Sequence, residues 1–197
     1  MNILETPSDR LLVAVRQLLM SKGIAGREEI AERIRVTDSA SPAQGARMVA
    51  RAWTDPAYRA RMLADGAKAA EELDIPMRGM PPLGVLEDTP DTHNLVVCTL
   101  CSCYPRAVLG YPPFWFKSAA YRARAVRDPR GLLVEFGTTL PDDVKLRVVD
   151  STADYRWMVL PLRPAGTEGW SEDRLAALVT RDALVGVALP TLPLAAE

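Results

Sequence analysis

The stretch Leu95-Val96-Val97-Cys98-Thr99-Leu100-Cys101-Ser102-Cys103 joins a short apolar run to all three cysteines of the chain. A run of this kind predicts a buried strand, which would end where the cysteines begin. An odd number of cysteines at such short spacing does not indicate a disulfide framework. In a reducing cytosol, clustered thiols more often serve metal binding or redox chemistry. The stretch therefore predicts a strand that leads into a metal-binding or redox-active loop.

The sequence before this stretch is typical of helices, and the sequence after it mixes strands with helices. Pro7-Ser8-Asp9, Ser41-Pro42 and Asp55-Pro56 are typical helix starts. Helices are therefore expected over residues 9–23, 27–36, 41–53, 55–63 and up to 73. Further on, we expect strands at residues 85–87, 95–97, 145–149 and 155–160, and helices at residues 119–126, 128–137 and 172–179, with a loop at residues 104–113.

A link rich in proline and glycine separates these two parts. Pro76, Gly79, Pro81, Pro82 and Gly84 interrupt any regular element. We therefore expect an α+β fold with a boundary at residue 80. Residues 1–80 would form a helical N-terminal arm. Residues 81–197 would form a layered α/β domain, with a small mixed sheet, that carries the cysteine loop and the chemistry.

The composition is that of an ordinary water-soluble protein. Of the 197 residues, 48% are hydrophobic and 25% are charged, with a net charge of −1. Nucleic acid is not expected as a partner, because phosphate binding requires a surplus of basic residues. Neither a membrane span nor a signal peptide is evident. A cytoplasmic protein without membrane contact is therefore expected.

Several kinds of site could use these cysteines. Plain burial of inert thiols would not explain why they cluster. A structural zinc site needs four ligands, so the single histidine, His93, would have to join the three cysteines. His93 is more readily placed at the surface or beside a metal site. The spacing of Cys101 and Cys103 is also tight for zinc, and an iron–sulfur cluster would need a fourth cysteine.

Another kind of site uses the backbone as well as the thiols. The sulfurs of Cys101 and Cys103, with the amide nitrogens of Ser102 and Cys103, could surround an ion in one plane. Cys98 would then supply a fifth donor, and a sixth position would stay open, as catalysis requires. Amide nitrogens bind only when deprotonated, which requires a strongly polarising ion such as trivalent cobalt or iron.

Val97-Cys98-Thr99-Leu100-Cys101-Ser102-Cys103 resembles the metal-binding signature of nitrile hydratase α-subunits and of the related thiocyanate hydrolase γ-subunit. Other segments resemble the family in the same order, over roughly residues 45 to 190. They include Ala52-Trp53-Thr54-Asp55-Pro56, Leu109-Gly110-Tyr111-Pro112-Pro113-Phe114-Trp115-Phe116-Lys117-Ser118 and Arg163-Pro164-Ala165-Gly166-Thr167-Glu168-Gly169-Trp170-Ser171.

This resemblance implies the metal and its ligands. Cys98 would remain a thiolate, Cys101 would be a sulfinate and Cys103 a sulfenate. Ser102 and Cys103 would also provide backbone amide nitrogens. In the family, threonine after the first cysteine accompanies cobalt, so Thr99 implies low-spin trivalent cobalt, with iron or zinc as the less favoured ions.

The resemblance also implies a reaction and partners. A nitrile hydratase is a hydro-lyase that adds water to a small nitrile to form the amide. The sulfenate oxygen of Cys103 would act as nucleophile or base, with the Ser102 hydroxyl close to the open position. A β-subunit would complete the enzyme, and a metallochaperone or activator would load the cobalt. Two alternatives remain open, namely a thiocyanate hydrolase γ-type subunit and a non-catalytic metal-binding module.

Arg106 departs from the family pattern. Family members commonly have a tryptophan three residues after the last cysteine, where this chain has Arg106. The change would put a cation in the pocket wall, which favours a polar or heteroaromatic nitrile, such as the nucleoside toyocamycin. The alternative is that Arg106 faces solvent, as arginine usually does.

A second departure lies before the Arg163-Pro164-Ala165-Gly166 motif, where Leu162 replaces the usual glutamine. Arg163 itself is retained and is expected to support the residues that hold the metal. A structural ion pair is an equal alternative for this side chain.

Overall fold

The computed structural model of this protein describes residues 7–101 and 103–192. Contacts divide the chain into two compact units, residues 1–39 and residues 40–197. The link at residues 76–84, within which we expected a boundary at residue 80, lies inside the second unit and joins a helix to a strand. Residues 40–80 are grouped with the strands because their helices pack against them.

The described part of the first unit contains α1 (Pro7–Ser21) and α2 (Arg27–Ser39), close to the predicted ranges. Helix α2 has no buried residue among those described. Large apolar side chains of α1 are exposed, namely Leu11, Leu12, Val13, Val15 and Leu18. Both helices therefore leave apolar surface that their own unit does not bury. Within the described ranges, no helix is both long enough and apolar enough to cross a lipid bilayer.

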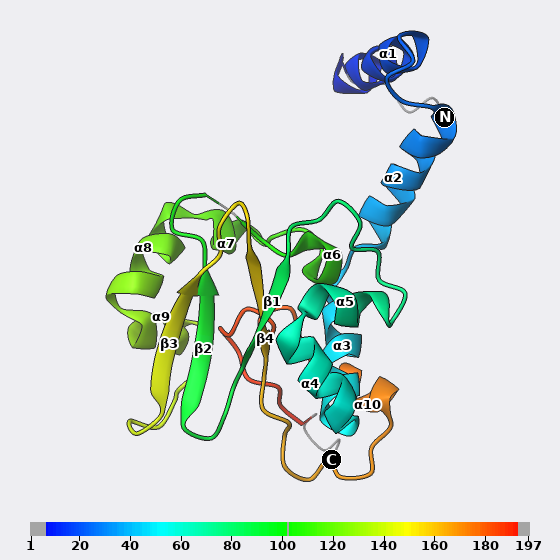
Figure 1. The fold of residues 1–197 in the computed structure, drawn as a ribbon. Helices are drawn as coiled ribbons and strands as arrows, with labels where there is room; N and C mark the ends of the chain where they lie inside the picture. The colour runs from blue at the N-terminus through cyan, green and yellow to red at the C-terminus, as the bar shows by residue number, and fades with distance from the viewer. Residues whose placement is uncertain (1–6, 102, 193–197) are drawn as a thin grey trace, which may run out of the picture. The chain divides into compact units, whose positions relative to one another are not determined.

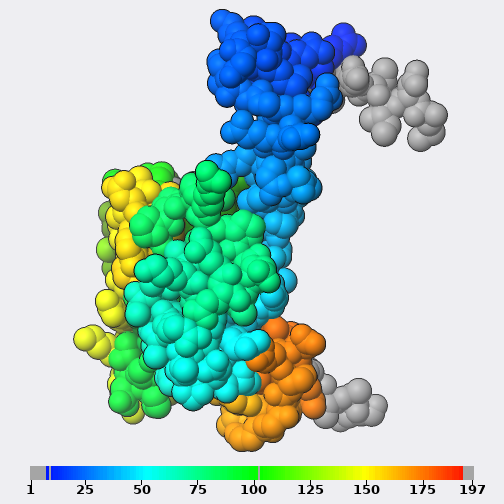
Figure 2. Space-filling model, turned by 45° about the vertical axis from the view of Figure 1, so that its right-hand side comes forward, coloured from blue at the N-terminus to red at the C-terminus, as the bar shows by residue number. Residues whose placement is uncertain are grey.

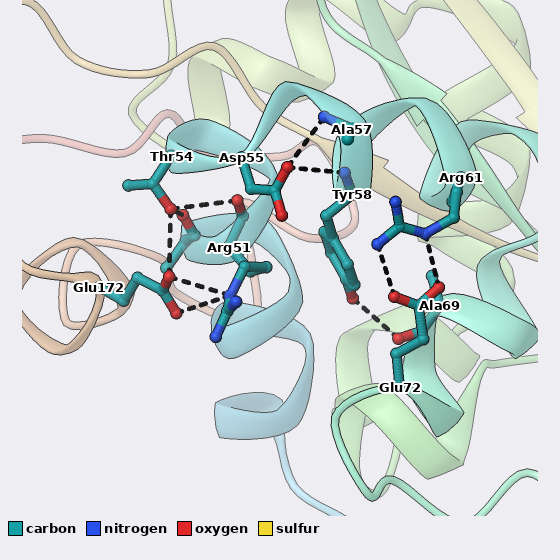
Figure 3. A network of polar contacts seen from close by, with 10 residues as sticks. Arg51, Thr54, Asp55, Ala57, Tyr58, Arg61, Ala69, Glu72 and Glu172 are labelled. Carbon is teal, nitrogen blue, oxygen red and sulfur yellow. Dashed lines mark hydrogen bonds and ion pairs between the residues drawn. The ribbon is translucent and has the colours of Figure 1, made fainter.

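The second unit opens with three helices, and the first two begin at the predicted starts, after Ser41 and Asp55. The Asp55 carboxylate accepts hydrogen bonds from the backbone nitrogens of Ala57 and Tyr58, at 2.9 and 3.0 Å (Figure 3). The Tyr58 hydroxyl donates to the Ala69 carbonyl at 2.9 Å and so joins the second helix to the third. The three helices are α3 (Pro42–Thr54), α4 (Pro56–Ala64) and α5 (Gly66–Glu71).

A polar contact ties the end of the chain to this helical group. Helix α10 (Glu172–Ala176) packs against α3, and Figure 2 shows its orange surface beside the cyan of the early helices. The Arg51 guanidinium donates to the Glu172 carboxylate at 3.0 Å, and the Thr54 hydroxyl donates to it at 3.3 Å (Figure 3). Residues far apart in the sequence thus form one packed layer.

Among the described residues, four short strands form the centre of the second unit, at or near the predicted positions. They pair as two parallel ladders, β1 with β4 and β2 with β3 (Figure 1). The mixed sheet that we expected is replaced by these two pairs, because sequence patterns indicate strands but not their partners. The bounds are β1 (Leu83–Glu87), β2 (Thr92–Val97), β3 (Lys145–Asp150) and β4 (Arg156–Leu160).

Helices flank the strands on both sides (Figure 1). Helices α4 and α5 contact β1, whereas α8 (Ala119–Arg127) contacts β2 and α9 (Pro129–Glu135) contacts β3. The segment at residues 104–113, predicted as a loop, contains the short helix α6 (Arg106–Leu109), and α7 (Phe114–Lys117) follows it. One turn of helix is too short to be recognised from periodicity.

The segment around Gly186 closes the core against β2. Gly186 has φ +87°, and a Cβ there would lie 1.9 Å from the Asn94 carbonyl oxygen, so only glycine fits. The Val185 carbonyl accepts from the Val96 nitrogen at 2.9 Å. This close approach also brings the Gly186 carbonyl to the side chain of His93.

His93, which we expected at the surface or beside the metal site, is buried in β2. Its Nδ1 lies 3.0 Å from Asp88 Oδ2, and its Nε2 lies 2.8 Å from the Gly186 carbonyl oxygen. Both ring nitrogens therefore face acceptors, which suits a doubly protonated ring. Burial lowers the pKa of His93, but the hydrogen bond and charge of Asp88 outweigh burial and raise the pKa above its ordinary value of 6.5.

Replacing His93 with glutamine tests this buried pair. The variant leaves Asp88 without its cation, so the free energy of unfolding should fall by roughly 3–5 kcal/mol. A raised histidine pKa stabilises the fold fully below about pH 6.5, and this contribution is lost as the pH rises through the folded-state value. Urea denaturation between about pH 6 and pH 9 should therefore show that the free energy of unfolding falls more steeply with pH in the wild type than in the variant. Parallel pH curves would contradict the charged pair.

Candidate metal centre

The three cysteines predicted as ligands come together at the carboxyl end of β2. Their sulfur atoms all lie within 4.8 Å of one another. Cys98 and Cys103 are buried, whereas Cys101 is exposed. The Sγ atoms of Cys98 and Cys101 are 3.5 Å apart, and those of Cys101 and Cys103 are 3.2 Å apart. The loop therefore offers a compact set of three sulfur donors.

The sulfur spacing indicates the geometry that such a loop fits. Two sulfurs at about 2.3 Å from one ion are about 3.3 Å apart at a right angle and about 3.8 Å apart at the tetrahedral angle. The observed distances of 3.2 and 3.5 Å fit neighbouring positions at a right angle better. The cysteines thus fit an ion with square or octahedral coordination, and they fit tetrahedral zinc less well.

The histidine needed for a zinc site is also engaged elsewhere. The Asp88 carboxylate lies against Nδ1 of His93, and the Gly186 carbonyl oxygen lies against Nε2. Among the described residues, the metal-ligand cluster consists of the three cysteines without any histidine or carboxylate. Further donors at this site would have to come from the backbone, from solvent or from another molecule.

Ser102, predicted as a backbone ligand and a catalytic side chain, lies outside the described residues. The Cys103 side chain is described, and burial, with hydrogen bonds from Cys101 and Cys98, raises the pKa of its thiol to about 12. Without a cation, Cys103 therefore holds its proton at neutral pH. Metal binding at this sulfur requires the proton to leave, so binding is coupled to proton release.

Two side chains outside the cysteine cluster hold the loop in place. Asp150, at the end of β3, accepts a hydrogen bond from the Thr99 nitrogen at 3.0 Å and another from the Thr99 hydroxyl. Arg122, from α8, donates to the carbonyls of Thr99 and Leu100 at 3.2 and 2.9 Å. The loop therefore has protein contacts on two sides that do not depend on the metal.

Sequence reasoning did not identify Asp150 or Arg122 as residues of the site. A signal for Asp150 was present, because it directly follows a predicted strand at residues 145–149. Parallel pairing with β2 then places it opposite Val97. Arg122 belongs to a segment that resembles the family, Tyr121-Arg122-Ala123-Arg124, but neither its residue type nor its spacing indicates a contact with the loop.

The two arginines singled out in the sequence lie in different surroundings. Arg106 is exposed, and its guanidinium stacks over the Tyr111 ring at 4.3 Å from the ring centre. Arg163 donates to the Thr167 hydroxyl at 2.9 Å, to the Thr167 carbonyl and to the Trp53 carbonyl at 3.1 Å. These contacts tie the loop after β4 to α3, and a role of Arg163 at the metal stays a prediction.

Comparison with known proteins identifies the family. A profile described as "Nitrile hydratase, alpha chain" matches residues 6–188. The chain belongs to the nitrile hydratase α-chain family. The family's enzymes are hydro-lyases.

Individual relatives of this family agree with the assignment. A low-molecular weight cobalt-containing nitrile hydratase subunit alpha from Rhodococcus rhodochrous is 50% identical over 181 residues, which cover 91% of this chain and 87% of that protein. A thiocyanate hydrolase subunit gamma from Thiobacillus thioparus is 44% identical over 191 residues, covering 91% of this chain and 79% of that protein.

A solved structure has the same fold. It is a recombinant thiocyanate hydrolase with partially modified cobalt centres, which matches with a TM-score of 0.83 and 42% identity. The match covers 94% of this chain and 91% of that chain. The predicted family and the mixed α and β fold are therefore confirmed.

Substituting Asp150 with alanine tests whether β3 holds the metal loop. The change removes both hydrogen bonds to Thr99, so the free energy of unfolding should fall by about 1–2 kcal/mol. Affinity for the metal ion should fall roughly tenfold, as expected when a partner of the ligand loop is lost. Retention of metal after dialysis against a chelator, measured by elemental analysis, checks this. Asp154→Ala, an exposed change nearby, is the control, and equal retention in both variants would refute the role of Asp150.

Proposed function

We propose that this chain is the α-subunit of a nitrile hydratase and binds low-spin trivalent cobalt. The ligands would be the sulfurs of Cys98, Cys101 and Cys103 and the backbone amides of Ser102 and Cys103. The observation that carries the proposal is the cluster of three sulfurs within 4.8 Å of one another, on a chain of this family. Relatives named as cobalt-containing support the choice of metal, as does Thr99 after the first cysteine.

The proposed reaction adds water across the carbon–nitrogen triple bond of a nitrile. When bound, trivalent cobalt supplies a Lewis acid that polarises the nitrile or acidifies a water molecule. Cys101 would be a sulfinate and Cys103 a sulfenate, whose oxygen accepts a proton from water or attacks the nitrile carbon. The Ser102 hydroxyl would lie close to the reacting group. If water attacks, its oxygen ends on carbon and both of its protons end on nitrogen, which gives the amide. If the sulfenate oxygen attacks, that oxygen stays on carbon as its bond to sulfur breaks, and the oxygen of water replaces it on sulfur while the two protons again end on nitrogen.

A β-subunit is proposed to cover the open side of the loop. Leu100, between two of the cysteines, is 87% exposed, and Phe114, after α6, is 86% exposed. Large apolar side chains with such exposure usually mark a protein interface. The relatives are themselves named as subunits. A metallochaperone or activator would load the cobalt, and the complex would work in the cytoplasm.

The substrate is proposed to be a polar or heteroaromatic nitrile, with toyocamycin as one example. Arg106 supports this, because it lines a cavity that is also lined by Tyr104, the residue after Cys103. The Tyr111 ring stacks on the guanidinium, which holds it in a defined position. The side chains that would do the chemistry belong to residues 81–197, the part of the chain expected to be catalytic.

Metal analysis and mass spectrometry test the centre. The chain, co-expressed with its β-subunit and activator in cobalt-supplemented medium, should contain cobalt in equimolar amount. Its tryptic peptide should carry a sulfinate at Cys101 and a sulfenate at Cys103. Cys103→Ser should abolish nitrile turnover. Zinc with unmodified thiols would refute the proposal, and bound cobalt without turnover of any nitrile would favour the non-catalytic module.

Replacing Arg106 with tryptophan tests the substrate class. Loss of the cation should raise the KM for a heteroaromatic nitrile about tenfold and leave a small aliphatic nitrile unaffected or improved. Arg127→Trp, at an exposed position on α8, controls for a new surface tryptophan. Better turnover of the aliphatic nitrile than of the heteroaromatic one by the wild type would contradict the proposed substrate.

Thiocyanate hydrolysis is the second candidate function. It is favoured by the similarity to thiocyanate hydrolase in sequence and in structure, and a cation at Arg106 would suit an anionic substrate. Assays of the cobalt-loaded complex with thiocyanate and with nitriles separate the two functions.

A further inference from the structure

A cation from α8 contacts the backbone of the metal loop. The Arg122 Nη1 atom donates to the carbonyls of Thr99 and Leu100, at 3.2 and 2.9 Å. Tyr121, the preceding residue of α8, is buried, and its hydroxyl donates to the Val96 carbonyl at 2.7 Å. This contact holds α8 against the end of β2. Because the guanidinium extends from a helix that is itself held in place, its position beside the loop is defined by the fold.

The Leu100 carbonyl that accepts from Arg122 shares its peptide group with the Cys101 nitrogen. This nitrogen donates to the Cys98 sulfur at 3.3 Å. Cys98 is buried, so little water competes for that sulfur. The amides proposed to bind the metal lie further along the loop, so the Cys101 amide keeps its proton and remains a donor. The cation, one peptide group and a sulfur ligand therefore form a continuous chain of hydrogen bonds.

Such a chain changes the electron density at the sulfur. A guanidinium draws electrons from the carbonyl oxygen that it contacts, which makes the N–H of the same peptide group a stronger donor. A thiolate that accepts a stronger hydrogen bond gives less electron density to its metal, and hydrogen bonds to sulfur tune copper and iron–sulfur centres in this way. An ion that receives less electron density is a stronger Lewis acid toward a group at its open position.

We propose that Arg122 is a positioning residue that acts through the Leu100–Cys101 peptide on the Cys98 sulfur and so makes the bound ion more acidic. The inference deepens the proposed function, on which its effect on turnover rests. The charge of Arg122 is essential to this role, because a neutral donor would hold the loop without withdrawing as much electron density.

The contact of Asp150 with the same loop differs in this respect. Asp150 accepts from the Thr99 nitrogen, whose peptide group carries the Cys98 carbonyl and has no donor directed at a sulfur. Asp150 therefore holds the loop, whereas Arg122 both holds it and acts on a ligand.

Substitutions that separate charge from attachment test this role. Arg122→Lys keeps a cation, Arg122→Gln keeps a donor without charge, and Arg122→Met keeps only apolar length. The full chain with its β-subunit, loaded anaerobically with cobalt(II) alone, should show a thiolate-to-cobalt absorption band. This band should move to longer wavelength in Arg122→Gln and Arg122→Met, because a more electron-rich sulfur transfers an electron to the metal more easily. Arg122→Lys should absorb close to the wild type.

Two controls distinguish loss of the charge from loosening of the loop. Arg127→Met removes an exposed arginine from the same helix and should leave the band unchanged. Asp150→Ala loosens the loop at Thr99 but keeps the cation, so its band should not move to longer wavelength. Thermal unfolding shows whether each variant has folded, and Arg122→Lys against the wild type remains informative if the neutral variants have not. An unmoved band in the neutral variants, or an equal shift in Arg122→Lys, would overturn the inference.

Turnover by the complex loaded with trivalent cobalt provides a second readout. The kcat for a nitrile should fall about tenfold in Arg122→Gln and stay within about twofold of the wild type in Arg122→Lys. An unchanged kcat in Arg122→Gln would contradict the effect on acidity. If the band moves as expected but the wild type hydrates no nitrile, the action of Arg122 on the sulfur is supported and the proposed reaction fails. If nitriles are hydrated and the band does not move, the inference fails and the reaction stands.

Discussion

The parallel pairing of β2 with β3 is the contact on which the metal loop depends. It places Val97, the last residue before the cysteines, in register with Asp150. The Ser151 nitrogen then donates to the Val97 carbonyl at 2.7 Å, so the two strands end together. From this position the Asp150 carboxylate accepts both hydrogen bonds from Thr99. The chain direction at the first ligand is therefore set by the strands before any metal binds.

The rest of the second unit keeps these strands in place. The buried ion pair of His93 with Asp88 joins the start of β2 to the turn before it, and the Gly186 carbonyl adds a contact from the end of the chain. Because a buried charge is costly without its partner, these elements are stable only together. Asp150 thus holds the metal loop at the carboxyl end of β2, and His93 holds β2 itself near its amino end.

The proposed centre combines rigid support with one open side. Buried Cys98 and Cys103 face the protein, whereas Cys101 and Leu100 are exposed. An exposed apolar tip suits a partner subunit, and the cavity with Arg106 lies on the side of α6. Reactive sulfur, partner surface and substrate cavity would then meet around one short loop. Such an arrangement keeps the catalytic groups on regular elements, which position them well.

The sequence by itself determined the family, most of the element types and the three cysteines that are proposed as metal ligands. Helix caps, apolar runs and cysteine spacing are local signals. Each is a pattern of residue types at fixed separations along the chain, so it can be recognised without knowledge of the tertiary structure. The sequence also identified Arg106, since that residue directly follows the loop. The short helices α6 and α7 were not predicted, because one turn has no usable periodicity.

Only the tertiary structure decided which strands pair, where His93 lies and which distant side chains reach the loop. Asp150 lies more than forty residues beyond the cysteines, and the parallel pairing of β3 with β2 brings it to the site. The sequence alone is compatible with His93 at the surface, whereas in the structure the Gly186 segment packs against it. The physical reason is that pairing register and burial depend on contacts between segments, which a local pattern cannot specify.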